Sequence, residues 1–454
     1  MAAPIENRVL DTTISMLEKH SLCDRCLGRQ FAWLSTNTSN VDRGRSIKLV
    51  LSMLADDELK SKNTEHGKRI ISLLAGKGMF EPAQAIAEKN GIEVTPEDEC
   101  HFCTFDGQSI FDRVEAVAKT ASELIQDTEF DTFLVGTIAN PALDDRQDEL
   151  RAEYSLLHAE ALKSDFSREL GKQIHDIIKK EVNFEKPDVV FIYDIVRNKV
   201  KLQINPIFIF GKYRKLMRGI PQSRWDCKTC MGKGCDECNG TGRRYPDSIS
   251  EYVGIVAQKM AKGTRFKFHA AGREDVDVLM LGEGRPFVVE VSEPHIRSPD
   301  LMKLMKAINK RANKRVQVQD LRMTNREHSQ KLKEDASSNI KEYTAVIETD
   351  TSVSKENLQR VERDFSGIEI EQRTPTRVSH RRSDLVRKKR IHEVHLRKLA
   401  DKTIEASFKV QGGTYVKELI SGDDGRTVPS LSSIIGTNCT CKELNVTAVY
   451  GAKQ

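Results

Sequence analysis

The 454-residue chain lacks three features, and each absence excludes a class of protein. It has no run of 18 apolar residues, so we expect no membrane-spanning helix. Its first residues, MAAPIENRVLDTTISML, include acids and lack a basic stretch followed by an apolar core, so we expect no secretory signal. It also has no internal repeat or low-complexity tail. At 454 residues the chain is long enough for two or three domains, and we expect it to be cytoplasmic or to work in whichever compartment holds its substrate.

The chain also has little excess charge, because the net charge is only +5. Any nucleic-acid surface must therefore be local. Residues 302–334 hold ten Lys and Arg against three acids, and residues 377–398 hold nine against two, with three histidines. Such runs suit phosphate contacts on RNA, although a solvated helix face is the alternative interpretation. Two dense runs within one predicted domain favour nucleic acid.

A disulfide framework is not expected, because dense disulfides belong to short secreted chains. The ten cysteines form five close pairs: Cys23/Cys26, Cys100/Cys103, Cys227/Cys230, Cys235/Cys238 and Cys439/Cys441. The first four have C-x-x-C spacing, which indicates metal binding in a cytosolic protein. The last pair alternates along a strand-like run, so we expect both thiols to pack in the core.

Two zinc sites are candidates. Cys23, Cys26, Cys100 and Cys103 would give four thiolates, which make a closed structural zinc site. A redox pair or unrelated core cysteines are alternatives, and the long separation leaves open whether the pairs share one ion. Cys227, Cys230, Cys235 and Cys238 form a tighter set among turn-forming glycines. A flexible, oxidisable linker is its alternative, so this second metal remains a further candidate.

The element pattern predicts an α+β protein. Residues 1–105 form a Cys-bracketed N-terminal region, with helices expected at 43–60 and 81–91. Residues 106–222 form a predicted α/β RNA-binding domain, residues 223–248 a Cys/Gly linker, and residues 249–454 a second α+β domain.

Several elements are predicted within these domains. We expect a strand at 130–138, two helices in 149–182 that break near 164–165, and three β-rich runs in 187–216. A turn at Gly282–Gly284 is expected to close a hairpin between 276–281 and 285–292.

The stretch FKFHAAGREDVDVLMLGEGRPFVVEVSEPHIR, residues 266–297, sets several charges where a strand begins. A partly buried Asp275 would stay ionised only if a cation pairs with it, because burial disfavours a carboxylate. An ionised and oriented carboxylate can act as a nucleophile or a base. A solvated acidic turn is the alternative, and a lone G-R-x-D pattern would favour it.

This stretch resembles the catalytic motif of the archaeal tRNA pseudouridine synthases that modify positions 54 and 55 of the T arm. The matching stretches, in order, are GREDVDV (272–278), MLG (280–282), GRPF (284–287), KEYTA (341–345), GTYVKEL (413–419), GRTVPS (425–430) and CKELNV (441–446). FGKYRKL (210–216) resembles the end of that family's THUMP domain, an RNA-binding module. The pairs Cys23/Cys26 and Cys100/Cys103 match its N-terminal zinc site.

The resemblance implies isomerisation of uridine to pseudouridine in tRNA, without a catalytic metal or other catalytic cofactor. Asp275 would be the nucleophile, attacking ribose or base, and Lys417 would pair with it. Many relatives have arginine at that position, so the bidentate fork is lost here. Tyr343 would stack on the flipped uracil, near the place where the C5 proton leaves.

The remaining implied roles concern substrate binding. Tyr415 would line the pocket, Leu444 would pack under the base, and Arg273 and Arg426 would contact phosphates or brace the cleft. The expected partner is tRNA, with no membrane and no obligatory protein partner. The THUMP-like domain would hold the tRNA near its acceptor end, and the basic segment 377–398 would grip the T arm. Whether position 54, position 55 or both are modified stays open, as does the oligomeric state.

Two other functions remain as alternatives. A non-catalytic, zinc-stabilised RNA-binding or chaperone protein would explain the cysteines and both basic runs. It would leave the order of Asp275, Tyr343, Lys417 and Leu444 unexplained. A THUMP-containing methyltransferase would need a glycine-rich cofactor loop between a strand and a helix. Gly282–Gly284 has no helix after it, which disfavours this class.

Overall fold

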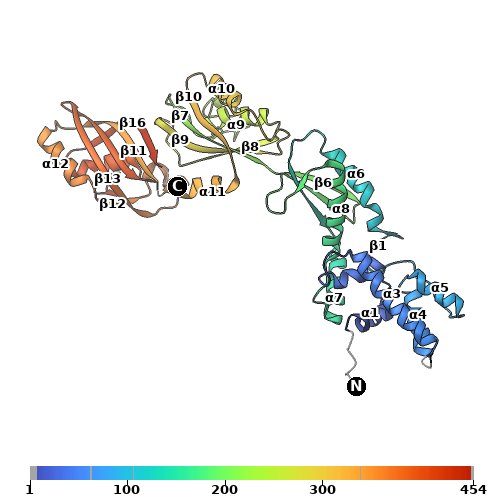
Figure 1. The fold of residues 1–454 in the computed structure, drawn as a ribbon. Helices are drawn as coiled ribbons and strands as arrows, with labels where there is room; N and C mark the ends of the chain where they lie inside the picture. Colours follow the sequence, from blue (N-terminus) through green and yellow to red (C-terminus); the bar gives the residue numbers. More distant parts are fainter. Residues whose placement is uncertain (1–7, 62–63, 106, 338, 451–454) are drawn as a thin grey trace. The chain divides into compact units, whose positions relative to one another are not determined.

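The computed structural model describes residues 8–61, 64–105, 107–337 and 339–450. The chain divides between Asn205 and Pro206 into two compact units, whose elements are labelled in Figure 1. No helix in the described residues is long and apolar enough to cross a membrane. Both units mix helices with sheets, so the predicted α+β class is confirmed.

The first unit begins with a group of helices around the N-terminal cysteines. Its helices are α1 (Arg8–Lys19), α2 (Asp24–Gly28), α3 (Asn40–Leu59), α4 (Thr64–Ala75) and α5 (Glu81–Lys89), and a short β1 (Thr104–Phe105) and β2 (Gln108–Ser109) hairpin follows. The side chain of Ser39 caps α3 by accepting a hydrogen bond from the amide of Asp42. The helices predicted at 43–60 and 81–91 are therefore confirmed as α3 and α5.

The rest of the first unit is a four-stranded sheet with helices. It contains α6 (Val114–Leu124), β3 (Thr132–Ile138), α7 (Pro141–Tyr154), α8 (Leu162–Ile178), β4 (Glu181–Val182), β5 (Val189–Asp194) and β6 (Lys199–Ile204). The strand order is β4-β3-β5-β6, and β3 runs parallel to both β4 and β5. The break between α7 and α8 falls at residues 155–161, earlier than the predicted 164–165.

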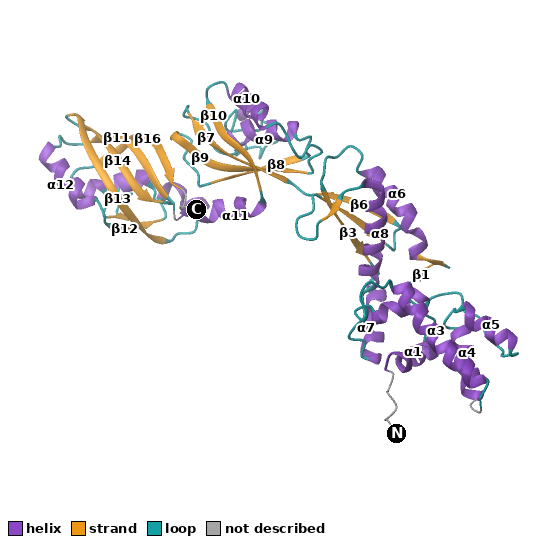
Figure 2. Ribbon diagram, in the orientation of Figure 1, coloured by secondary structure: helices purple, strands orange, loops and turns teal. Residues whose placement is uncertain are grey.

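The second unit is built on a ten-stranded sheet. Its strands are β7 (Ile207–Lys215), β8 (Arg265–Ala270), β9 (Leu279–Ser292), β10 (Val316–Thr324), β11 (Ile340–Thr349), β12 (Glu369–Arg373), β13 (Val386–Ala400), β14 (Thr403–Gln411), β15 (Thr427–Val428) and β16 (Cys439–Tyr450). The order is β10-β7-β9-β16-β11-β14-β13-β12-β15, with β8 also pairing β9. Figure 2 shows these strands in orange, with β7 to β10 in one group and β11 to β14 in the other.

The two strand groups meet along a narrow seam. There β16 pairs parallel to β9, through Asn445 with Leu279 and Val446 with Met280. Elsewhere β16 pairs antiparallel to β11, which brings Leu444 opposite Ala345 and Val446 opposite Tyr343. Residues from both groups therefore come close to each other at this seam.

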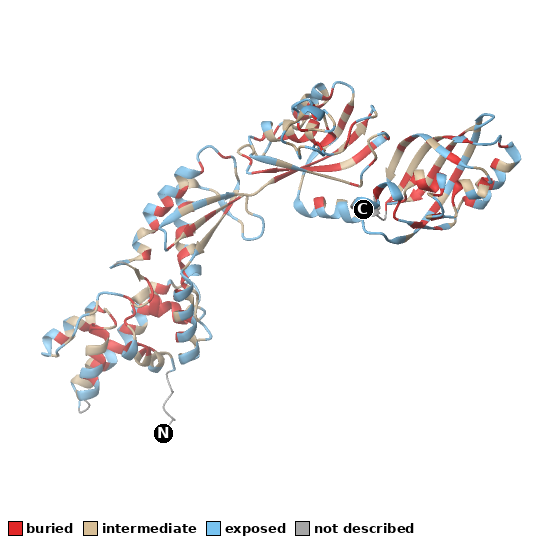
Figure 3. Ribbon diagram, turned by 180° about the vertical axis from the view of Figure 1, so that it is seen from behind, coloured by how far each residue is buried: buried red, intermediate tan, exposed pale blue. Residues whose placement is uncertain are grey.

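Helices cover both strand groups of the second unit. They are α9 (Ile249–Met260), α10 (Leu301–Ala312), α11 (Arg326–Glu334), α12 (Lys355–Phe365), α13 (Val416–Ser421) and α14 (Leu431–Ile435). Helices α9 and α10 contribute buried residues to the same continuous core as α12, α13 and α14. By contrast α11, which belongs to the basic stretch 302–334, is mostly exposed (Figure 3).

The predicted hairpin at Gly282–Gly284 is wrong. Strand β9 continues through these residues, and its register against β7 shifts between Tyr213 and Lys215, so the glycines form a bulge. Both glycines have positive φ, and a Cβ at Gly282 would lie 1.9 Å from the carbonyl oxygen of Thr447. Glycine is thus required for this bulge, and the same residue pair would equally suit a turn.

The segment 207–215 differs from the expectation that the RNA-binding domain extends to residue 222. As β7, it pairs with β9 and β10 in the sheet of the second unit. The predicted run of three β-rich segments in 187–216 is therefore split, since β5 and β6 belong to the first unit. Strand β7 instead contributes residues to the floor of the cavity described next.

Candidate active site and metal centres

A small cavity of about 130 Å³ lies in the second unit, at the seam between its two strand groups. Its lining comes from the β8–β9 turn, β11, α13 and β16, together with residues around 377–382. Asp275, Tyr343, Lys417, Tyr415 and Leu444 all line it. Residues that are up to 169 positions apart in sequence are thus brought to one place.

Asp275 lies in the turn between β8 and β9, and its side chain is 33% exposed. Lys215 stabilises this turn, because its Nζ donates to the carbonyl oxygens of Asp275 (3.0 Å) and Val276 (2.8 Å). Lys215 is fully buried, and burial lowers its pKa to about 8. Its two hydrogen bonds fix the backbone from which the Asp275 carboxylate projects.

The preceding residue, Glu274, points in the opposite direction, into the protein. Arg285 Nε lies 2.8 Å from its carboxylate, and the Tyr213 hydroxyl lies 2.8 and 2.9 Å from its two oxygens. Gln222 extends this network by donating to Tyr213 Oη and to the carbonyl of Gly272, both at 2.9 Å. The cavity therefore has a rigid, buried and hydrogen-bonded floor.

The aromatic and apolar residues of the cavity sit on neighbouring elements. Tyr343 projects from β11, and Leu444 is buried on the adjacent strand β16. Burial raises the pKa of Tyr343 to about 12, although the nearby Arg285 opposes this change. The Tyr343 hydroxyl is therefore protonated at neutral pH. Tyr415 is the residue just before α13, where its backbone carbonyl and amide bond to Gln372.

The cations near Asp275 differ from the prediction that Lys417 is its direct partner. Lys417 Nζ lies 2.6 Å from Asp277 Oδ2 but 3.9 Å from Asp275 Oδ2. Arg377 Nη1 lies closer to Asp275 Oδ2, at 3.0 Å. Asp275 thus has a basic partner, as expected, and a residue of the basic segment 377–398 is the nearer one.

The two predicted phosphate-contact residues lie in different places. Arg273 lines the cavity, and its guanidinium lies 5.4 Å from the ring of Trp225, which is another lining residue. Arg426 lies outside the lining and donates to the carbonyl of Thr374 at 3.0 and 2.7 Å. It also pairs with Asp384 at 2.8 Å. Arg426 therefore braces the segment that carries Arg377.

The two N-terminal cysteine pairs form one cluster, a question that their long separation in sequence had left open. The sulfurs of Cys23, Cys26, Cys100 and Cys103 all lie within 4.8 Å of one another, and the pair Cys23–Cys103 is 3.6 Å apart. A tetrahedral zinc ion with Zn–S bonds of about 2.3 Å requires S–S edges of about 3.8 Å. The four thiols therefore fit a metal ion, although they come from segments more than 70 residues apart.

The second cluster is local and sits in the second unit. Cys227, Cys230, Cys235 and Cys238 also have all sulfurs within 4.8 Å, with separations of 3.7 to 3.9 Å for three of the pairs. Backbone amides of Gly234 and Gly242 point at cysteine sulfurs at 3.1 Å, as is typical of thiolate ligands. This cluster could hold a metal ion as well. The last pair packs as predicted, with Cys439 buried and Cys441 partly buried.

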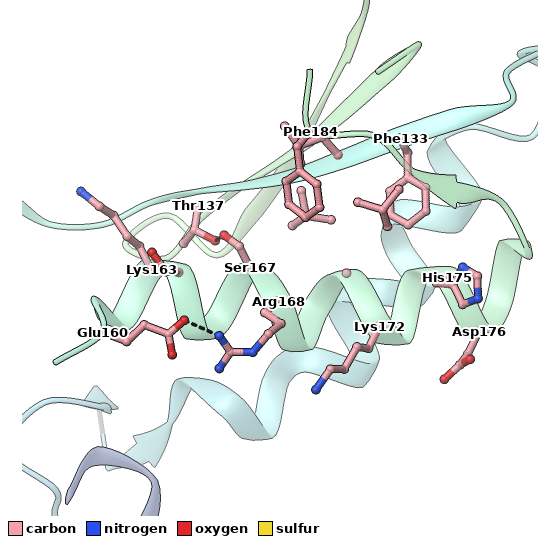
Figure 4. Close-up of a pocket in the computed structure, with 15 residues that line it drawn as sticks. Phe133, Thr137, Glu160, Lys163, Ser167, Arg168, Lys172, His175, Asp176 and Phe184 are labelled. Carbon is pink, nitrogen blue, oxygen red and sulfur yellow. Dashed lines mark hydrogen bonds and ion pairs between the residues drawn. The ribbon is translucent and has the colours of Figure 1, made fainter. Parts of the chain in front are cut away.

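A larger cavity of about 850 Å³ lies in the first unit, between α8 and the strands β3 and β4. Figure 4 shows Phe133 and Phe184 on the strand side and Lys163, Arg168 and Lys172 along α8. Phe184 is 82% exposed, whereas Phe133 is buried. The cavity thus combines basic side chains with an exposed aromatic ring.

Sequence reasoning missed several residues around the smaller cavity. Arg377 was counted only within a basic run, and Trp225 only within the linker. Glu274 and Arg285 were quoted in motifs without a role, and Lys215 was placed in the wrong domain. The adjacency of Glu274 to Asp275 was a usable signal, because residues in a tight turn can point to opposite sides. The position of Arg377 had no local signal.

Comparisons with known proteins agree across nearly the whole chain. Residues 208–450 match the family model "Pus10, C-terminal", and residues 117–194 match "Pus10 THUMP domain, archaeal". The curated tRNA pseudouridine synthase Pus10 of Methanocaldococcus jannaschii is 39% identical, over 99% of this chain and 98% of that protein. The protein of the same name from Methanothrix thermoacetophila is 38% identical, over 98% and 96%.

One solved structure, a Cbf5-Nop10-Gar1 complex, gives a TM-score of only 0.27 at 17% identity, over 44% of this chain and 46% of that chain. That likeness is too slight to bear on fold or function. The family models and the curated relatives suffice, because one model spans more than half of the chain and the relatives align over almost all of it. The chain belongs to the Pus10 family.

Proposed function

We propose that this protein isomerises uridine to pseudouridine in tRNA, at position 54, position 55 or both in the T arm. The observation that carries the proposal is the meeting of Asp275, Tyr343, Lys417 and Leu444 in one cavity, in a member of the Pus10 family. In this reaction the N1–C1′ bond breaks, the base turns, and C5 bonds to C1′. The C5 proton leaves, and N1 gains one.

Five of the lining residues, and Arg426 outside the lining, have roles in this proposal. The target uridine is flipped out of the RNA so that its base and ribose reach the cavity. Asp275 attacks the ribose or the base, and its carboxylate is oriented by the backbone bonds from Lys215. The Tyr343 ring stacks on the uracil, while Leu444 and Tyr415 limit its movement. Arg273 contacts a phosphate near the flipped nucleotide, and Arg426 braces the cleft from outside.

The main test replaces the nucleophile. Asp275→Asn keeps the size of the side chain but removes its charge, so the product-forming rate should fall by more than about 10³-fold. Tritium release from C5-labelled uridine in tRNA measures the reaction, and filter binding measures the affinity for tRNA. The affinity should stay within about twofold of wild type. Asp364→Asn, an exposed substitution on α12, is the matched control.

The outcome also separates the competing functions. A non-catalytic RNA-binding protein would release no tritium even as wild type. A methyltransferase would release it only with a methyl donor present. Turnover retained by Asp275→Asn would remove Asp275 from the nucleophile role.

Tyr343→Phe separates stacking from proton transfer. With its pKa raised to about 12, the hydroxyl can accept the C5 proton only while passing its own proton on. Loss of a positioned proton-transfer group typically costs about 10² to 10⁴ in rate. We expect the tritium-release rate to fall by about 10²-fold with unchanged tRNA affinity. Loss of tRNA binding would contradict both roles.

We propose that zinc occupies both four-cysteine clusters, as a structural ion in each. The all-thiolate donor sets and the sulfur separations support this choice over harder metals. Elemental analysis should give two zinc ions per wild-type chain. Cys103→Ser and Cys238→Ser should each lower this number to one. A value of one in the wild type would mean that one cluster is a reduced thiol group.

We also propose that the domain at residues 117–194 contacts tRNA through the larger cavity. Lys163 and Lys172 are half exposed along it, and Phe184 offers a ring for stacking. Lys163→Gln with Lys172→Gln should lower the slope of log affinity against log salt by about 1.5. The rate at saturating tRNA should not change. Lys68→Gln on α4 is the control, and an unchanged slope in the double variant would exclude this surface.

A tRNA substrate also sets the expected compartment, which we propose is the cytoplasm. The basic segment 377–398 is proposed to grip the T arm. Its charged residues on β13 are mostly exposed, except for Lys389, which is buried against the carbonyl of Gly412. Removing the exposed charges should weaken tRNA binding and flatten its salt dependence.

A further inference from the structure

The cavity contains two cations near Asp275, and both approach the same carboxylate oxygen. Arg377 Nη1 is 3.0 Å from Oδ2, and Lys417 Nζ is 3.9 Å from it. At 3.0 Å the two groups are within hydrogen-bonding distance, whereas 3.9 Å leaves only the Coulomb attraction. The distances therefore rank Arg377 ahead of Lys417.

Lys417 is already engaged by another acid. Its Nζ lies 2.6 Å from Asp277 Oδ2, a shorter separation than either contact to Asp275. Burial opposes ionisation of Asp277, but the hydrogen bond and charge of Lys417 lower the pKa of Asp277 overall. Asp277 is therefore an ionised competitor for the lysine, and it leaves Asp275 dependent on a different cation.

Arg377 is held in place by a buried acid. Its Nε lies 2.6 Å from Glu418 Oε1, and its Nη2 lies 3.4 Å from Glu418 Oε2. The Glu418 side chain is only 7% exposed. One edge of the guanidinium thus binds Glu418, and Nη1 remains for Asp275. Such a planar fork can hold two carboxylates in fixed directions, which an ammonium group cannot do.

The backbone around Arg377 is fixed independently of Asp275. Arg377 lies in the 3-10 helix η5 (Thr376–Arg381), within the connection between β12 and β13. The amide of Thr376 donates to Asp423 Oδ2 at 2.9 Å, and Arg426 donates to the carbonyl of Thr374. Together with Glu418, these contacts fix the position of the Arg377 guanidinium without any contribution from Asp275.

We propose that Arg377 is a positioning residue, which holds the Asp275 carboxylate in one orientation, and that Glu418 fixes Arg377 for this purpose. The inference deepens the proposed function and rests on it. It assigns a role to a residue outside the motif stretches that the sequence resemblance covers. It also ties the nucleophile to η5, whose neighbour Arg382 lines the same cavity.

The test compares variants of Arg377, Glu418 and Lys417 in the full-length protein, with tRNA in single-turnover reactions. Arg377→Gln should lower the tritium-release rate at saturating tRNA by about 10²-fold, as expected for a misplaced reacting group. Its tRNA affinity should stay within about twofold. Arg377→Lys should recover part of the rate, because the charge returns without the fork. Arg377→Ala should gain rate on addition of guanidinium ion, which a purely structural defect would not.

A double variant guards against an indirect effect. Arg377→Gln leaves Glu418 buried without its cation, and this alone could distort α13. The double variant that combines Arg377→Gln with Glu418→Gln also removes the buried negative charge of Glu418. A rate that stays low supports the inference, and a rate that recovers to wild type overturns it. Arg360→Gln, an exposed residue of α12, is the matched control for arginine removal.

The result also separates this inference from the proposed function. If the wild type releases no tritium from tRNA, the proposed function fails. If the wild type is active and Arg377→Gln reacts at the same rate, only the role of Arg377 fails. If Lys417→Gln lowers the rate more than Arg377→Gln does, Lys417 is the main partner and the inference is overturned.

Discussion

Glu274 and Asp275 are adjacent in sequence, but their side chains lie in two different regions on either side of the β8–β9 turn. The Glu274 side is a closed floor in which the side chains of Glu274 and Arg285 are each 1% exposed and hydrogen-bonded. The Asp275 side is an open mouth in which Arg377 pairs with Asp275 and Lys417 pairs mainly with Asp277, and the Asp277 side chain is 67% exposed. The same turn therefore contacts a buried hydrogen-bonded network on one side and a partly solvated group of charges on the other.

This difference has a physical reason. A buried ion pair is costly to break, because the partner that remains is an unpaired charge in a medium of low polarity. An exposed pair contributes little, because water replaces either partner. We therefore expect substitutions on the floor to change stability and substitutions at the mouth to change chemistry. The following predictions test this division.

The largest effect on stability is expected for Glu274→Gln. This change leaves the Arg285 guanidinium buried without its counter-charge, which should lower the free energy of unfolding of the second unit by about 3 to 5 kcal/mol. The chain has only two tryptophans, Trp33 and Trp225, one in each unit. In a Trp33→Phe background the fluorescence of Trp225 reports urea unfolding of the second unit alone.

Glu283→Gln is the matched control for this measurement. Glu283 lies on the same strand β9 but is exposed, so its change should stay within about 0.5 kcal/mol. If Glu274→Gln lowered the free energy of unfolding by less than about 1 kcal/mol, the floor would be more hydrated than its contacts indicate. The division between floor and mouth would then not hold.

The floor also marks the limit of what could be predicted from sequence. Asp275, Tyr343 and Leu444 stand in motifs, and the structure brings them together. Each N-terminal cysteine pair was recognisable because C-x-x-C spacing is a local and chemically specific signal, whereas the meeting of the two pairs was left open. Arg377 had no such signal, since its contact with Asp275 spans about one hundred residues. A basic run identifies charge but not which member faces inward.

The fold shows the same limit. The strand at 130–138 and the helix at 81–91 were predictable, because local periodicity determines them. The β character of 207–215 was predictable as well, but the sheet that this strand joins was not, because its pairing with β9 and β10 is non-local. The sequence around Gly282 and Gly284 predicts a hairpin turn, but positive φ is needed in both a turn and a bulge. Only the pairing register of β9 against β7 distinguishes a bulge from a hairpin turn.

The floor should also make stability depend on pH. Burial, reinforced by Arg285, lowers the pKa of Lys341 to about 7, and burial lowers that of Lys215 to about 8. Between pH 8 and 10 the native state has released the Lys341 proton and completes the release of the Lys215 proton, whereas the unfolded chain still binds both. Stability therefore rises with pH, by about 1.4 kcal/mol per pH unit for Lys341 and by a slope that approaches this value above pH 8 for Lys215.

Lys341→Met isolates one of these two contributions. In the Trp33→Phe background, the slope of unfolding free energy against pH between 8 and 10 should fall by about 1.4 kcal/mol per pH unit. The other charged groups near Lys341, namely Glu274, Arg285 and Lys389, are the same in both proteins. Lys388→Met on β13 is the exposed control and should leave the slope unchanged. Equal slopes for Lys341→Met and wild type would show that Lys341 is hydrated.

The smallest effect on stability is expected at the mouth, for Asp277→Asn. Asp277 itself is 67% exposed in its pair with Lys417, so the free energy of unfolding should fall by less than about 1 kcal/mol, and by less still at high salt. Urea unfolding at two salt concentrations checks this, with Glu405→Gln, which breaks an exposed pair with Arg397, as the control. The released Lys417 is then free to approach Asp275, so the tritium-release rate should change by no more than about fivefold. A stability loss above about 2 kcal/mol would instead make the mouth a second rigid network, and the contrast between Glu274 and Asp275 would disappear.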